Sequence, residues 1–159
     1  LFLKASRIQE EVLDANHPDL ALSYNNLGNV YSDKGDYGQA EEFFLKALQI
    51  QEEVLDAKHP HLALSYRSLG NVYFNKEDYR RAEEFFLKAL QIIEEALEAN
   101  HPDLALLYNS LGHVYFNKED YGRAEEFYLK ALRIREEIFD ANHPRLKSTY
   151  KDLEDVYNE

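Results

Sequence analysis

One stretch of 42 residues recurs along this chain, and the repetition limits the possible folds more than any other feature. The copies begin at His17, His59, His101 and His143, so the spacing is 42 residues each time. About 30 of the 42 positions are identical between the first two copies. A fixed period of this length is typical of arrays in which one small structural unit stacks on the next.

Each unit is predicted to begin with a helix at its His-Pro step. Proline favours the first position of a helix, and the residue before a proline avoids helical geometry. In the first unit we therefore expect His17 to be the N-cap and the helix to run to about Asp33. Gly28 interrupts this helix and indicates that another helix passes very close. The apolar residues follow a 4-3-4 spacing on one helix face, namely Leu20, Tyr24, Leu27 and Tyr31.

A second helix is predicted from about Tyr37 to Leu55, which makes each unit a helical hairpin and the fold all-α. Small and large apolar residues form its inner stripe, namely Ala40, Phe44, Ala47 and Leu48. Four glutamates fall off this stripe and are expected to be solvated, namely Glu41, Glu42, Glu52 and Glu53.

The turn between the two helices differs among the copies. Gly35 suits the left-handed residue that ends a helix, and Asp36 is a good N-cap for the next one. Glu77 and Glu119 replace that glycine in the second and third units. Either these glutamates accept a left-handed conformation or the turn differs there.

The repeat divides residues 1–159, which we expect to form one domain, into five parts. The first part matches the second half of a unit, so we expect a helix without its partner and a chain that is a piece of something longer. The last part is a single first helix with a more polar face, as expected of a capping helix. The five parts are residues 1–16, 17–58, 59–100, 101–142 and 143–159.

Charge and composition exclude several classes of function. The formal net charge is −12, which argues against binding nucleic acid or an anionic membrane surface. The chain has no cysteine, no run of about 18 apolar residues and no signal-like start. These features favour an intracellular, cytoplasmic protein, and the acidic surface suits a basic partner.

The repeated residues resemble the tetratricopeptide repeat. That family has an aromatic, Leu-Gly, Tyr, Ala, Phe and Ala at these offsets, and here the third unit has Tyr in place of Phe. The 42-residue period and the His-Pro turn look like the kinesin light chain subclass. The matching positions are Tyr24, Leu27, Gly28, Tyr31, Ala40, Phe44 and Ala47, then Tyr66, Leu69, Gly70, Tyr73, Ala82, Phe86 and Ala89, then Tyr108, Leu111, Gly112, Tyr115, Ala124, Tyr128 and Ala131.

The resemblance implies a right-handed α-solenoid of antiparallel helix hairpins, with a concave groove lined by the first helices. The groove candidates also fall off the apolar stripe, and several of them differ between copies. They are Leu22, Asn25, Asn26, Asn29, Ser32 and Asp33, then Leu64, Arg67, Ser68, Asn71, Phe74 and Asn75, then Leu106, Asn109, Ser110, His113, Phe116 and Asn117.

These groove residues suit an extended peptide or a partner helix. Asparagine amides can bond a peptide backbone, and Phe74 and Phe116 can act as apolar anchors. In the kinesin light chains, asparagines on the first helices clamp peptide backbone; here Asn26 becomes serine in the next two units. Arg67 alone cannot form the carboxylate clamp of chaperone-binding relatives, so a peptide with an acidic C-terminus is not expected.

Two alternatives to a peptide-binding scaffold remain at this point. Copies of the chain could assemble head to tail through the unpaired helices at their ends. Otherwise the array could be a consensus-type repeat protein with no natural ligand.

An enzyme, a metal site and a cofactor are not expected. The repeated histidines lie one unit apart, roughly 10 Å, which is too far for them to share one ion. The repeated glutamate pairs lack the unique constellation that a catalytic site requires.

Overall fold

Seven helices account for almost all of residues 17–159, which are the residues that the computed structural model describes. They are α2 (Pro18–Asp33), α3 (Tyr37–Val54), α4 (Pro60–Asn75), α5 (Tyr79–Ala96), α6 (Pro102–Asn117), α7 (Tyr121–Ile138) and α8 (Pro144–Tyr157). The predicted helix in residues 1–16 lies outside the described residues. The described part contains no strand, which confirms the all-α prediction.

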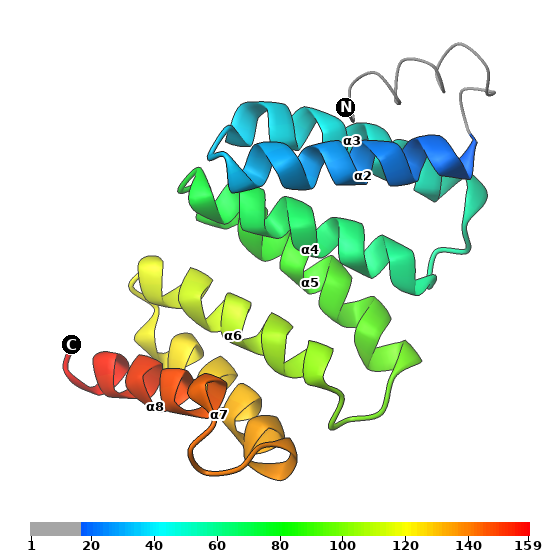
Figure 1. Cartoon of the computed structure of the whole chain (residues 1–159). Helices are drawn as coiled ribbons and strands as arrows, with labels where there is room; N and C mark the ends of the chain where they lie inside the picture. Colours follow the sequence, from blue (N-terminus) through cyan, green and yellow to red (C-terminus); the bar gives the residue numbers. More distant parts are fainter. Residues whose placement is uncertain (1–16) are drawn as a thin grey trace.

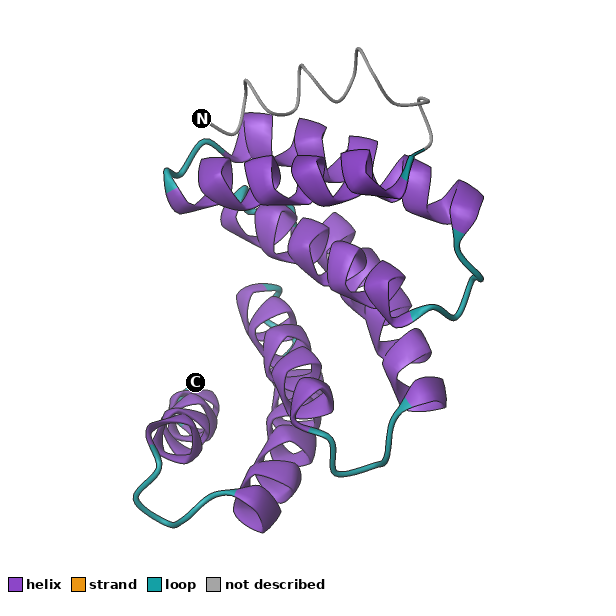
Figure 2. Ribbon diagram, turned by 45° about the vertical axis from the view of Figure 1, so that its right-hand side comes forward, coloured by secondary structure: helices purple, strands orange, loops and turns teal. Residues whose placement is uncertain are grey.

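Antiparallel hairpins stack into a solenoid. Helix α2 packs on α3, α4 on α5 and α6 on α7, and each hairpin contacts the next through α3–α4 and α5–α6. Helix α8 packs against α7 as the first helix of a further unit would. Helices α2, α4, α6 and α8 lie along one face in Figure 1, and Figure 2 shows the curved path of the stack.

The repeated histidines cap the helices that follow them, as predicted. Each is extended, and its Nδ1 accepts a hydrogen bond of 3.2 Å from the backbone N–H two residues later. In α2 the donor is the N–H of Asp19. This bond satisfies one of the N–H groups that a helix start leaves without a partner. The caps are His17, His59, His101 and His143.

The turn glutamates adopt the left-handed conformation, which decides between the two alternatives. Gly35 has φ +76°, and Glu77 and Glu119 both have φ +60°. The turn hydrogen bonds are also the same, because Asp36 N donates to Tyr31 O and Asp78 N donates to Tyr73 O, both at 2.9 Å. The hairpin geometry is therefore kept at the expense of local strain at the glutamates.

The helical glycines allow an aromatic ring of the second helix to lie directly on the first helix. A Cβ placed on Gly28 would lie 2.6 Å from the Phe44 ring, and one on Gly70 would lie 2.6 Å from Phe86. The prediction of a close approach at this position is confirmed, and the group that approaches is a side-chain ring. Alanines from the second helix complete the contact and are fully buried, as at Ala40 and Ala82.

The glutamates that we expected to be solvated include two repeated positions that join neighbouring hairpins. Tyr66 Oη donates to Glu52 Oε1 at 2.7 Å, and Tyr73 Oη donates to Glu41 Oε1 at 2.7 Å. Lys76 also bonds Glu41. The prediction was wrong for these positions, because the partners belong to the next unit, beyond the reach of a periodicity argument within one helix.

Burial alone would raise the pKa of Glu41, but hydrogen bonds from Lys76 and Tyr73 and nearby positive charges lower it overall. Glu83 has the same environment one unit later, with Lys118 and Tyr115 as its hydrogen-bond donors, and its pKa is also lowered. Both carboxylates are thus held in their charged form between neighbouring hairpins.

Candidate functional site

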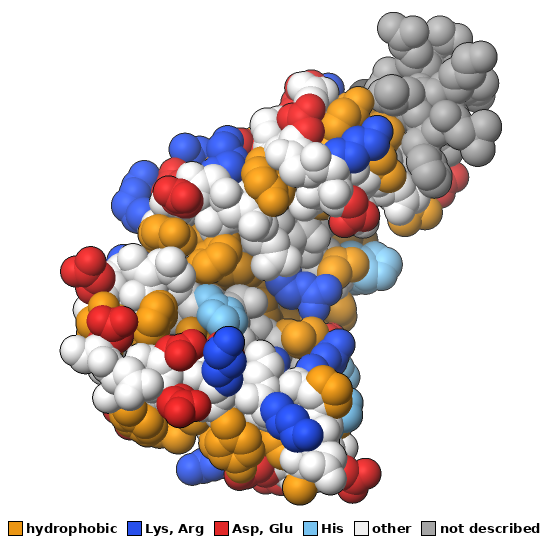
Figure 3. All heavy atoms as spheres, turned by 60° about the vertical axis from the view of Figure 1, so that its left-hand side comes forward, with side chains coloured by type: hydrophobic (Ala, Val, Ile, Leu, Met, Phe, Trp, Pro, Cys, Tyr) orange, Lys and Arg blue, Asp and Glu red, His pale blue; other side chains and the backbone are white. Residues whose placement is uncertain are grey.

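Two adjoining hollows lie between the first helices of successive units. The first has a volume of about 370 Å³ and lies between α2 and α4, above the end of α3. The second has a volume of about 300 Å³ and lies between α4 and α6, above the end of α5. His61 and Leu64 line both hollows, so the two form one continuous groove. Figure 3 shows a hollowed face on which charged, histidine and hydrophobic side chains lie together.

The floor of the groove contains exposed apolar side chains. Leu22 is 61% exposed, Leu64 is 50% exposed and Val54 is 43% exposed. These fractions are high for large apolar residues, and here the residues line a hollow together. Contiguous exposed apolar surface at a hollow is typical of an interaction site.

Polar groups from α2 and α4 lie beside this apolar floor. Asn25, Asn26 and Asn29 line the first hollow, and the last two are exposed. Arg67 lines the second, where its Nη1 lies 3.8 Å from Asp103 Oδ1. This exposed ion pair is worth little to stability and leaves the guanidinium accessible to a ligand.

The remaining candidates of α2 and α4 lie beside the groove without lining its two hollows. Phe74 is half-buried, with its ring 5.5 Å from Tyr79 and 6.4 Å from His113. Asn75 donates to Asn71 O at 2.8 Å, so one of its amide hydrogens is occupied. Ser32 and Ser68 are half-buried, and Asp33 and Asn71 are exposed.

Asn109 is buried, which contradicts the expectation that it would face the groove. Arg135 Nη1 donates to Asn109 Oδ1 at 2.7 Å, and Asn109 Nδ2 donates to Asp152 Oδ2 at 3.4 Å. Arg135 also bonds Thr149, so α6, α7 and α8 share one polar cluster. The Asn109 amide is occupied within the molecule and is not free for a peptide backbone.

His113 belongs to the same cluster. Its Nε2 lies 2.7 Å from Asn109 Nδ2, and its Nδ1 lies 3.0 Å from Tyr128 Oη. Burial lowers the pKa of His113, the charge of Asp152 opposes that shift, and the charge of Arg135 adds to it. The imidazole is therefore kept neutral as part of the packing between α6 and α8.

The other third-unit candidates also bond within α6 or lie against α7. Ser110 donates to Leu106 O at 3.0 Å, and Asn117 donates to His113 O at 2.8 Å. The Phe116 ring lies 5.5 Å from Tyr121. The groove is thus formed mainly by the first two units and the start of α6.

The Arg135 cluster could have been found in the sequence by comparing two positions together. Residues 14 apart face each other across each unit interface, and they change as pairs. Ser65 Oγ donates to Gln51 Oε1 at 2.6 Å at the first interface. Ile93 and Leu107 are both buried at the second, and Arg135 bonds Thr149 at the third.

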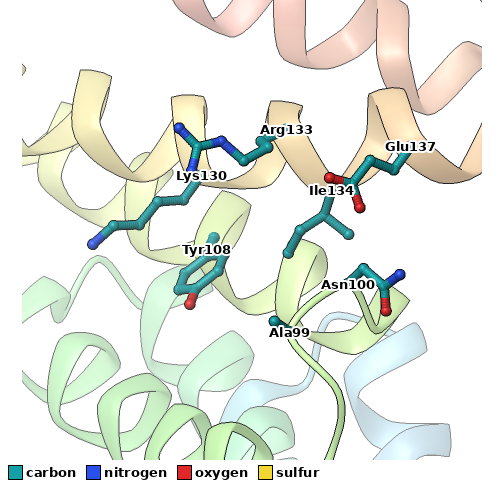
Figure 4. Close-up of a pocket in the computed structure, with 7 residues that line it drawn as sticks. All are labelled: Ala99, Asn100, Tyr108, Lys130, Arg133, Ile134 and Glu137. Carbon is teal, nitrogen blue, oxygen red and sulfur yellow. The ribbon is translucent and has the colours of Figure 1, made fainter.

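A further hollow lies outside the groove and shares none of its lining residues. It has a volume of about 520 Å³ and is shown in Figure 4, with Tyr108, Lys130, Arg133 and Glu137 among its lining side chains. A smaller hollow occurs one unit earlier, at positions that are 42 residues lower. There Lys58 Nζ lies 2.7 Å from Glu95 Oε2, whereas Asn100 takes the place of Lys58 in the larger hollow.

Metal and membrane features were examined over the described residues. Across residues 17–159 no three His, Cys, Asp or Glu side chains gather so that they could hold a metal ion. None of the helices in this part is both long and apolar enough to cross a membrane.

The geometry defines a class of protein, a helical-repeat scaffold with a groove along its first helices. Comparison with family models matches the tetratricopeptide repeat at residues 1–53, 24–95, 61–137 and 103–159. The chain therefore belongs to the tetratricopeptide repeat family, whose members generally mediate protein–protein interactions. The comparison with curated proteins found no match.

Solved structures with the same fold include kinesin light chain-like proteins. A putative kinesin light chain of Podosopora anserina with nearly identical TPR-like repeats has a TM-score of 0.85 and 22% identity, over 99% of this chain and 74% of its own. BtubC (BKLC) from P. vanneervenii has a TM-score of 0.88 and 26% identity, over 99% of this chain and 63% of its own. The N-terminal domain of stress-induced protein-1 from C. elegans has a TM-score of 0.62 and 20% identity, over 86% and 96%.

Proposed function

We propose that the groove formed by α2, α4 and the start of α6 holds an extended peptide or a partner helix of another protein. The observation that carries this proposal is the continuity of the two hollows through His61 and Leu64. One ligand segment can therefore contact both units at once. The class of the fold supports the proposal, because tetratricopeptide repeats generally mediate protein–protein interactions.

The side chains of the groove indicate the ligand's chemistry. Leu22 and Leu64 provide exposed apolar surface for hydrophobic ligand side chains. Asn26 and Asn29 provide amide donors and acceptors beside it, which suits a peptide backbone. Asp19 and Asp103 line the two hollows, and together with the net charge of −12 they favour a ligand with basic residues.

A peptide-display selection tests this function. The chain is compared with a groove variant that combines Leu22→Ser, Leu64→Ser and Arg67→Ala. Serine already occupies the place of these leucines in α8, at Ser148. Exposed changes of this kind usually alter stability by less than about 0.5 kcal/mol each, so folding should be retained.

The matched control carries three exposed changes outside the groove, namely Arg80→Ala, Gln91→Ala and Glu98→Ala. We expect a motif with apolar and basic residues to be enriched on the original chain and on the control, and to be lost on the groove variant. The proposal fails if all three proteins select the same peptides, or if no peptide is enriched while circular dichroism shows all three to be folded.

A further inference from the structure

Each complete hairpin holds a phenylalanine of its second helix between two tyrosines of its first helix. The Phe85 ring lies 6.1 Å from Tyr66 and stacks on Tyr73 at 5.3 Å, with 11° between the ring planes. The same arrangement surrounds Phe43 and Phe127. We call it the two-tyrosine seat: two tyrosines seven residues apart on one helix, with an aromatic ring from a neighbouring helix between them.

Helix α8 carries the two tyrosines of a seat that no described residue fills. Tyr150 is 48% exposed and Tyr157 is 63% exposed, whereas Tyr115, which corresponds to Tyr157, is 3% exposed. Their hydroxyls are fixed, because Tyr150 donates to Glu136 at 2.6 Å and Tyr157 donates to Glu125 at 2.8 Å. Both rings are therefore held in place on α7 with their outer faces open.

Charge is also unbalanced at this seat. In the earlier copies, Glu83 accepts a bond from Lys118 and lies 3.9 Å from Arg123. The Arg123 guanidinium also lies over the Tyr115 ring, 4.4 Å from its centre. Glu125 occupies the corresponding place beside Tyr157, yet no Lys or Arg within residues 17–159 forms an ion pair with it. The open seat thus lacks an arginine as well as an aromatic ring.

Glu154 changes the shape of the seat. It stands where the other first helices have glycine, and a Cβ at Gly70 would lie 2.6 Å from the Phe86 ring. A helix that docks on α8 as α5 docks on α4 cannot place an aromatic residue over Glu154. Only a small side chain fits at that position of the incoming helix.

We propose that the outer face of α8, together with Glu125, is a second docking site, which takes a helix of a partner protein. The partner helix carries an arginine, an aromatic residue four positions later and a small residue directly after that. The first two features copy Arg81 and Phe85, which fill the seat formed by Tyr66 and Tyr73. The third feature follows from Glu154. This site is separate from the groove and does not depend on it.

A second copy of the chain fits this site poorly. Residues 1–14 match residues 43–56 in register, which places Leu1 at the ring position and Phe2 over Glu154. Leucine cannot stack between the tyrosines, and the phenylalanine meets the obstruction described above. Glu154 therefore opposes the head-to-tail assembly that the repeat pattern alone allowed.

Two synthetic peptides test the proposal against the full chain. One has the sequence of residues 79–96, and the other carries Phe86→Ala in that sequence. Fluorescence anisotropy measures their binding, and circular dichroism confirms that their helicity is similar. We expect the Phe86→Ala peptide to bind about tenfold more tightly than the unchanged peptide, because an aromatic stack without a clash contributes up to about that factor.

Substitutions in the full chain reverse or remove this preference. Glu154→Gly should favour the unchanged peptide, whereas Glu154→Ala, which keeps a Cβ, should still disfavour it. Tyr150→Ser with Tyr157→Ser should weaken binding of the Phe86→Ala peptide, and the groove variant should bind it normally. Equal binding of both peptides, loss of binding in the groove variant, or self-association of the original chain in light scattering would each overturn the proposal.

Discussion

At the scale of single residues, the turn shows how strongly the repeated geometry is imposed. Gly35, Glu77 and Glu119 occupy equivalent places and share the left-handed conformation, although only glycine adopts it without strain. The surrounding hydrogen bonds are the same in the first two units, so the packed hairpin determines the turn. Sequence alone leaves the conformation open, because a turn residue's preference is weaker than the packing on both sides of it.

Replacing Glu77 or Glu119 by glycine should therefore stabilise the protein. Each change removes left-handed strain and should raise the free energy of unfolding by about 1 kcal/mol. Urea denaturation monitored by circular dichroism measures this difference. The matched control is Gly35→Ala, which introduces the strain and should lower stability. No gain from either glycine would mean that these glutamates adopt the conformation without strain.

At the scale of helices, each unit interface contains its own pair of facing residues. The first joins Gln51 to Ser65 by a hydrogen bond, and the third joins Arg135 to Thr149. The second interface buries Ile93 and a leucine instead. Near-identical helices thus meet through three chemically different contacts, each of which suits only its own partner.

A double-mutant cycle at the third interface measures this matching. Thr149→Leu alone leaves the buried Arg135 without one of its acceptors and should cost about 1–3 kcal/mol. Arg135→Ile combined with Thr149→Leu copies the apolar second interface and should cost less than the sum of the two single changes. We expect a coupling energy of about 0.5–3 kcal/mol from urea denaturation. Additive effects would show that the pair is not matched.

The helices were largely predictable from the sequence, whereas the groove was predictable only in part. The His-Pro steps and the Asp36 cap predict helix starts, because these signals act within a few residues. The burial of Asn109 was missed because it depends on Arg135, which is distant in sequence and reaches Asn109 only through the packing of α7 against α6 and α8. The roles of Glu41 and Glu52 were missed for the same reason, since their tyrosine partners belong to the next unit.

At the scale of the whole molecule, neighbouring hairpins are linked by tyrosines that donate to carboxylates. Burial, with hydrogen bonding to a glutamate, raises the pKa of Tyr66, Tyr108 and Tyr115 to about 12. Their unfolded pKa is about 10. These contacts span the hairpin interfaces, so their loss would affect the array as a unit.

We therefore expect stability to fall as the pH rises from about 10 to 12. In that range the unfolded chain releases phenolic protons that the folded chain retains, so unfolding becomes more favourable as the pH increases. Urea denaturation at several pH values measures the slope, and Tyr66→Phe with Tyr108→Phe should reduce it. The control is Tyr79→Phe, because Tyr79 donates to the Asn117 amide at 3.3 Å rather than to a carboxylate. An unchanged slope in the double variant would contradict the prediction.

The matched interface pairs also bear on how such a gene can change. Near-identical coding repeats recombine unequally, and the simplest product loses one whole unit. Loss of residues 59–100 would place Leu107 against Gln51, which would bury an amide with no partner on the opposite helix. A shortened array of this kind would keep every helix and every turn and still be less stable, so the interfaces themselves disfavour contraction of the repeat.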